Sequence, residues 1–133
     1  IRVNCSETGD VQNDEVDASI WSDDITERVS KFGVSAFPAM QIAAYLGYKT
    51  LYLIGCDGGY KPVQDGVDLS HFDGAYRAFD AYPDYDYSRL NDALQIAHQI
   101  AQENCDRLGI EIINLSPNSK VKAHKFGNLE DVL

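Results

Sequence analysis

Basic residues are scarce in this chain. Its 133 residues include 11 Lys and Arg against 21 Asp and Glu, which gives a formal net charge of -10 at pH 7. Proteins that bind nucleic acid, or that dock on anionic membranes, contact phosphates through a basic surface. We therefore expect neither nucleic acid nor an anionic membrane as a partner. The acidic balance is equally typical of a surface that simply keeps a protein in solution.

Long apolar runs and cysteine motifs are also missing. No stretch approaches the roughly 20 apolar residues that a membrane-spanning helix needs, so the sequence predicts no transmembrane segment. The three cysteines, Cys5, Cys56 and Cys105, are an odd number without the paired spacing of zinc ligands. Free thiols of this kind are typical of the reducing cytoplasm. We expect a cytoplasmic protein, no metal site, and Cys56 as a small buried apolar residue.

Several enzyme signatures are absent as well. The chain has no nucleophile elbow, Walker loop, metal-binding helix motif or zinc cysteine pattern. Its length and its 44% content of hydrophobic residues predict one domain with a real core, over residues 1–133. The fold class therefore has to come from periodicity, and the function from isolated residues.

Residues 33–57 are the most informative segment. The pattern predicts a helix over 36–46, with Ser35 as its N-cap and Gly47 ending it. A short apolar strand is predicted over 50–54, of the kind buried in parallel sheets.

A second helix and strand follow after a long irregular stretch. Apolar residues at helical spacing predict a helix over 88–108, and residues 110–115 predict a second buried strand. This order predicts an α/β fold, a Rossmann-like three-layer domain with a mainly parallel sheet. The strand and glycine-rich loop that usually open such a domain are not in this sequence. We expect either the carboxyl-terminal part of a larger nucleotide-binding domain, truncated at its amino terminus, or an incomplete reading frame.

The remaining segments carry weaker patterns. Residues 1–5 are predicted as the end of a strand, and residues 6–24 as loop or weakly ordered chain. Residues 25–32 fit either a short helix or an approach to the glycine turn, and residues 120–126 fit a short helix or an irregular tail.

Polar residues at the predicted strand ends are the first candidate site. Ligands bind at the carboxyl ends of strands in open α/β sheets. The candidates for nucleotide binding there are Gly33, Ser35, Asp57, Asn118 and Ser119. Free amides at a helix start bind anions, and an aspartate can accept from a sugar hydroxyl or hold a cation. A plain helix cap and ordinary turns explain the same residues.

The long loop supplies the second group of candidates. His71 is its only histidine and can act as a general acid or base near neutral pH. Tyr60 and Tyr76 lie in the same tyrosine-rich stretch, and phenols can bind phosphate or stack on sugars. A structural histidine within an aromatic cluster is the alternative. The other two histidines, His98 and His124, are predicted to lie on the surface.

Three separated motifs resemble two related groups of enzymes. They are the run Ala-Ala-Tyr-Leu-Gly-Tyr-Lys-Thr-Leu-Tyr-Leu-Ile-Gly-Cys-Asp ending at Asp57, Ser70-His71-Phe72, and Leu115-Ser116-Pro117-Asn118-Ser119. Within residues 33–122 the chain resembles bacterial lipooligosaccharide sialyltransferases. It also resembles the domain family named after the archaeal 6-hydroxymethylpterin diphosphokinase, which includes motility-accessory flagellin glycosyltransferases.

The sialyltransferase resemblance implies a nucleotide-sugar donor, a glycan acceptor and no required cofactor. It implies that the turn at Gly33 and Ser35 touches the donor and that Tyr60 stabilises the departing phosphate. A loop histidine serves as general base in that group. Two histidines four residues apart are usual there, and the second one is catalytic; in this chain the first matches His71 and the second falls at Ala75, beside Tyr76. The spacing after Asp57 also differs by one residue.

Two other functions stay open at this point. A pterin diphosphokinase would need Mg²⁺ to bridge ATP phosphates, with Asp57 and Asp73 as candidate ligands. A non-catalytic chain that keeps only the fold would expose an apolar sheet edge, for which we expect a homo-oligomer.

Overall fold

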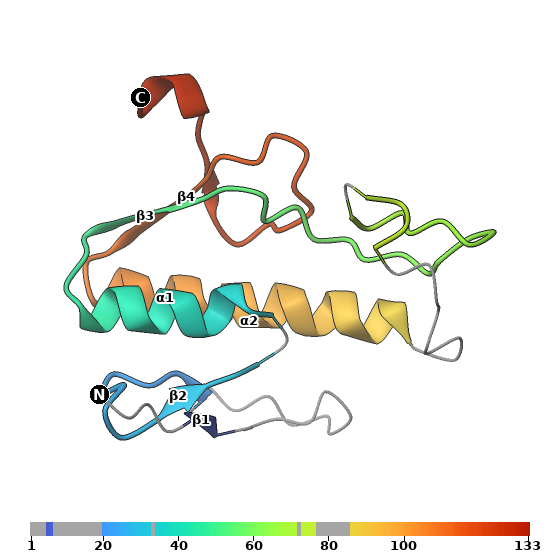
Figure 1. Cartoon of the computed structure of the whole chain (residues 1–133). Helices are drawn as coiled ribbons and strands as arrows, with labels where there is room; N and C mark the ends of the chain where they lie inside the picture. The colour runs from blue at the N-terminus through green and yellow to red at the C-terminus, as the bar shows by residue number, and fades with distance from the viewer. Residues whose placement is uncertain (1–4, 7–19, 33, 72, 77–85) are drawn as a thin grey trace.

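The computed structural model describes residues 5–6, 20–32, 34–71, 73–76 and 86–133. These residues form a mixed α/β structure with a three-stranded parallel sheet and two α-helices (Figure 1). The elements in chain order are β1 (Cys5–Ser6), β2 (Val29–Ser30), α1 (Ala36–Tyr45), β3 (Thr50–Leu53), α2 (Tyr87–Arg107), β4 (Glu111–Asn114), β5 (Lys125–Phe126) and a short 3-10 helix, η2 (Leu129–Asp131).

The main sheet has the order β3-β4-β5, and all of its strands are parallel. Thr50 pairs with Glu111 and Leu53 with Asn114, so β3 and β4 end at the same edge. The two predicted parallel strands are therefore confirmed. The prediction of a helix or an irregular tail over 120–126 missed β5. This strand is only two residues long, and it forms because β4 offers a second edge for pairing.

Both helices lie on the same face of this sheet, with α1 beside α2 (Figure 1). On the far side of the helices, β1 pairs with β2 in a separate two-stranded parallel sheet. The helix ends match their sequence predictions closely. Gly47 follows α1 with a φ of 86°, a conformation that glycine adopts without strain. Neither described helix is long and apolar enough to cross a membrane.

The start of α1 differs in one detail from the prediction. Ser35 occupies the N-cap position, but its side chain makes no capping hydrogen bond. Pro38 is accommodated in the first turn, where backbone amides lack partners within the helix.

Aromatic side chains fill the space between α1 and the segment that precedes it. Phe37 is fully buried, with its ring centroid 5.8 Å from that of Trp21 and 6.2 Å from that of Phe32, both edge-on. Ile20 and Trp21 are therefore core residues. The prediction of a loop or weakly ordered chain over residues 6–24 holds as a loop for residues 20–24, which form no strand or α-helix. Ile20 and Trp21 bury the start of this loop against α1. Residues 7–19 lie outside the described part.

A buried glutamine joins the same segment to α1. The side chain of Gln41 is completely buried, and its oxygen accepts from the backbone N–H groups of Ser22, at 3.2 Å, and Ser30, at 3.3 Å. Its amide nitrogen donates to the carbonyls of Ser30, at 2.9 Å, and Phe37, at 3.2 Å. Every hydrogen-bonding direction of the amide is thus used, which is what makes its burial tolerable.

Replacing this glutamine should destabilise the fold strongly. Gln41→Met keeps the shape but leaves buried backbone groups of Ser22 and Ser30 without partners. We expect a loss of about 2–4 kcal/mol in the free energy of unfolding, measured with urea. The matched control is Gln99→Met on the exposed side of α2, where the amide bonds only to Glu103. The control should cost about 0.5 kcal/mol or less; equal costs for the two variants would contradict this role of Gln41.

Candidate functional site

The hydroxyl of Ser119 connects the ends of β3 and β4. It donates to the carbonyl of Cys56 at 2.6 Å, and it accepts from the Asn114 side-chain amide at 2.9 Å and from the N–H of Val121 at 3.1 Å. A serine hydroxyl has one donor and two acceptor positions, so these contacts occupy it fully. Asn114 is itself completely buried, and its oxygen accepts from the N–H of Ser116 at 2.9 Å.

Two glycines let the loop after β3 approach the segment after β4. The carbonyl of Asp57 accepts from the N–H of Lys120 at 2.6 Å. A Cβ on Gly59 would lie 3.0 Å from Cγ of Lys120, and one on Gly58 would lie 3.3 Å from a methyl of Val121. Both glycines also have positive φ angles, 64° at Gly58 and 76° at Gly59. The chain itself therefore makes the close approach that the glycine pair predicts. The Asp57 side chain remains exposed.

A carboxylate–imidazole pair organises the long loop. The carboxylate of Asp68 is fully buried, and one of its oxygens lies 2.7 Å from Nδ1 of His71. The other oxygen accepts from the N–H of Ser70 at 2.8 Å. An ionised carboxylate only accepts hydrogen bonds, so Nδ1 of His71 carries a proton, and Nε2 is the ring nitrogen that does not face Asp68. The imidazole is 29% exposed, so it is oriented by a buried group while solvent and solutes can still reach it.

Two tyrosines flank this histidine. The Tyr76 ring lies 4.4 Å from the His71 ring between centroids, and the Tyr60 ring lies 6.3 Å away. The backbone of Tyr60 is fixed to α2 because its N–H donates to the Asn91 side chain at 2.7 Å and its carbonyl accepts from it at 2.9 Å. The structure therefore brings Tyr60, His71 and Tyr76 together, three of the residues proposed from sequence.

The other candidates are placed separately. Ser35 and Asn118 are exposed, at the start of α1 and in the turn after β4. Among the described residues, no hydrogen bond or ring contact joins Ser35 to the group around His71. Asp57 and Ser119 meet through the Asp57 carbonyl, 3.3 Å from the Ser119 hydroxyl. Gly33 lies outside the described residues.

Sequence reasoning missed two polar residues at this edge. Asp68 lies three positions before His71, a spacing that a turn can close, but nothing in the sequence shows that the loop buries it. Asn114 is a polar residue that directly follows Ile112 and Ile113 at the end of β4, and this position was the available indication of a structural role. The Ser116 hydroxyl is also buried and has no hydrogen-bond partner within the described part of the chain, so hydrogen-bonding capacity remains next to β4.

The prediction that His98 and His124 lie on the surface was wrong. They are only 2% and 3% exposed, and Nδ1 of His98 lies 2.8 Å from Nε2 of His124. Burial lowers the pKa of each from 6.5 to about 4. Both histidines can lie in the core because each ring supplies the polar partner that the other needs there. Cys56 is half-buried, and burial, with a smaller contribution from Asp57, raises the pKa of its thiol.

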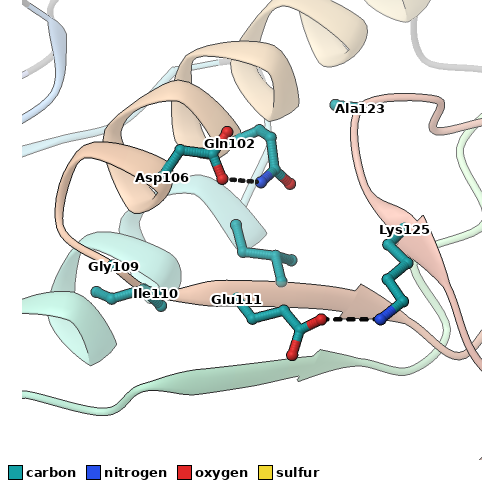
Figure 2. A pocket seen from close by; sticks show the side chains of 8 residues that line it. Gln102, Asp106, Gly109, Ile110, Glu111, Ala123 and Lys125 are labelled. Carbon is teal, nitrogen blue, oxygen red and sulfur yellow. Dashed lines mark hydrogen bonds and ion pairs between the residues drawn. The ribbon is translucent and has the colours of Figure 1, made fainter.

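A hollow lies at the start of β4, at the end of the strand away from Ser119 (Figure 2). It has a volume of about 580 Å³ and includes Gln102 and Asp106 of α2, Glu111, Ala123 and Lys125 in its lining. Lys125 pairs with Glu111 at 3.0 Å, and Gln102 donates to Asp106 at 2.7 Å.

No group of three or more His, Cys, Asp or Glu side chains could hold a metal ion in the part of the chain that the structure describes. Comparison of the sequence and structure with protein-family models, curated proteins and solved structures finds no match. The function is therefore inferred from the geometry of the site.

The two serines proposed for nucleotide binding should differ sharply in their effect on stability. Ser119→Ala removes a hydroxyl that serves Cys56, Asn114 and Val121, so we expect a loss of about 1–3 kcal/mol in the free energy of unfolding. Ser35→Ala, the control, removes an exposed hydroxyl that caps nothing and should change it by about 0.5 kcal/mol or less. Denaturant titration of both variants measures this; a neutral Ser119→Ala would show that the connection is not needed.

Proposed function

We propose that this chain is a Rossmann-like nucleotide-sugar-dependent glycosyltransferase domain of the sialyltransferase type, acting on surface glycans or glycoproteins. The observation that carries the proposal is the Asp68–His71 pair beside Tyr60. Glycosyl transfer needs a base for the acceptor hydroxyl and a donor of hydrogen bonds for the departing phosphate. A part-exposed imidazole with an oriented lone pair suits the first task, and a phenol suits the second.

His71 is the general base in this mechanism. Nε2 takes the proton of an acceptor hydroxyl while the hydroxyl oxygen forms a bond to the anomeric carbon of the donor sugar. Asp68 holds Nδ1–H and stabilises the imidazolium that results. The bond between the anomeric carbon and the phosphate oxygen breaks, and its electron pair stays with the phosphate. The Tyr60 hydroxyl donates a hydrogen bond to that oxygen as its charge develops.

The donor nucleotide is held by neutral groups and one carboxylate in this proposal. In this proposal the phosphate lies at the start of α1, beside Ser35, where first-turn amides lack partners within the helix. The exposed side chains of Asp57 and Asn118 bind sugar hydroxyls at the carboxyl edge of the sheet. The Ser119 hydroxyl holds this edge together, so its contribution to binding is to position its neighbours. Tyr76, exposed and close to His71, offers a ring on which the acceptor sugar stacks.

Nucleotide binding tests the donor site directly. We expect saturable binding of CMP without metal, measured by isothermal titration calorimetry, because the proposed contacts need no cation. Asp57→Ala should weaken binding about tenfold, the effect of losing one hydrogen bond to a charged group. The exposed control Asp131→Ala should not change it. Binding of ATP only in the presence of Mg²⁺ would instead favour a diphosphokinase, and no binding of either nucleotide would contradict the donor site.

Transfer activity tests the base. With CMP-sialic acid as donor and a galactose-terminated oligosaccharide as acceptor, we expect His71→Gln to lower kcat by about 100-fold or more, the usual contribution of a general base. Asp68→Asn should lower kcat and alter its pH profile, because the imidazole loses its buried partner. Asp65→Asn is the matched control, since Asp65 is exposed in the same loop and its φ of 51° suits asparagine. Full activity of His71→Gln would overturn this assignment.

A further inference from the structure

The buried histidine pair fastens the segment before β5 onto α2. His98 comes from the middle of α2, and His124 directly precedes β5. Their rings meet edge-on, with centroids 4.9 Å apart and an interplanar angle of 76°. The mechanism proposed above uses neither residue, although they are the most deeply buried histidines of the chain.

The neighbouring hydrogen bonds fix where the protons lie. Gln102 donates its amide N–H to Asp106, at 2.7 Å, so its amide oxygen faces Nδ1 of His124, at 2.8 Å. An amide oxygen only accepts, so Nδ1 of His124 carries a proton and Nε2 is the acceptor. His98 must then donate from Nδ1 across the 2.8 Å contact. Each imidazole holds one proton, and the contact requires His124 Nε2 to be bare.

We propose that His98 and His124 form an acid-sensitive latch: protonation of His124 at Nε2 breaks its contact with His98 and releases residues 123–127 from α2 and from β4. A proton at Nε2 would place two N–H groups against each other in a buried site, which is unfavourable. The proposal concerns a different part of the molecule from the Asp68–His71 site and does not depend on glycosyl transfer.

The charges around the pair act in both directions. Asp106 of α2 favours protonated His124, whereas burial and His98 oppose it more strongly, so the pKa of His124 falls to about 4. The thiol of Cys105, also on α2, stays neutral because burial raises its pKa to about 11. Glu111 of β4 is paired with Lys125 beside the same hollow. The charges on the adjoining chain are Lys120 and Lys122, both exposed.

The direction of the pH effect follows from these values. A histidine has a pKa of about 6.5 when the segment is released and about 4 when it is fastened. The fastened state therefore binds fewer protons, and its stability is full above pH 6.5 and is lost as the pH falls towards 4.

The released segment lines the hollow at the start of β4. Ala123 and Lys125 form one side of it, and Gln102 and Asp106 form the opposite side (Figure 2). Residues 120 and 122 have a separate attachment, because the Gln95 side chain bonds to the Lys120 carbonyl at 2.9 Å and to the Lys122 N–H at 3.2 Å. This attachment contains no titrating group, so opening is confined to residues 123–127 and widens the hollow.

Hydrogen exchange of the full chain between pH 7.5 and 4 tests the latch. The Gly127 amide, which donates to Asn114 in β4, reports the released segment, and the Leu115 amide, which donates to Leu53, reports the core. We expect the protection factor of Gly127 to fall by up to about tenfold per pH unit for each histidine below pH 6.5, while that of Leu115 changes much less. Equal loss at both amides would mean global unfolding and would overturn the proposal.

Two variants complete the test. His124→Gln can still accept from His98 but cannot titrate, so the pH dependence at Gly127 should flatten. The matched control, His71→Gln, removes the part-exposed histidine and should leave that dependence unchanged. If His124→Gln does not fold, NMR titration of the wild-type imidazoles decides: pKa values well below 6 for His98 and His124 support the latch, and values near 6.5 overturn it.

Discussion

The rest of the candidate site depends on the three hydrogen bonds of the Ser119 hydroxyl. Parallel strands bring β3 and β4 to one edge, but pairing alone does not fix the loops that leave it. Ser119 does so by linking the carbonyl after β3 to the buried amide of Asn114. Because Asn114 is completely buried, its amide must be satisfied, and the connection is costly to break. The loop is thereby held at Asp57, and Tyr60 is held three residues later by Asn91.

Side-chain amides, together with apolar contacts such as those of Trp21, fix the course of the irregular segments. Gln41 joins residues 22 and 30 to α1, Asn91 holds the loop at Tyr60, and Gln95 holds residues 120 and 122. Each of these side-chain amides forms hydrogen bonds with backbone groups that, in a regular strand, would pair with a neighbouring strand. The main sheet is small and its connections are long, so side-chain amides supply much of the order that a larger sheet would supply through pairing.

The sequence predicted α1, α2, β3 and β4 well because their patterns are local. Apolar spacing and Gly47 were enough to place α1, and two short apolar runs were enough to place β3 and β4. The burial of His98 could have been predicted from the apolar spacing of α2, but the residue was predicted to lie on the surface. It lies four residues after Leu94 and seven before Cys105, on the buried stripe of α2, yet its polarity suggested the surface. Its partner is 26 residues away, which no local pattern reveals.

The three histidines have the same side chain, but their surroundings suit them to two different roles. His71 is 29% exposed and faces a buried carboxylate that can stabilise its charged form, so it can accept a proton from a bound molecule. His98 and His124 face each other, and His124 cannot be protonated at Nε2 without losing its contact with His98. In the proposed mechanism the first arrangement exchanges protons with a bound molecule, and in the proposed latch the second holds two segments together until His124 is protonated. The difference comes from their partners, Asp68 in one case and a second imidazole in the other.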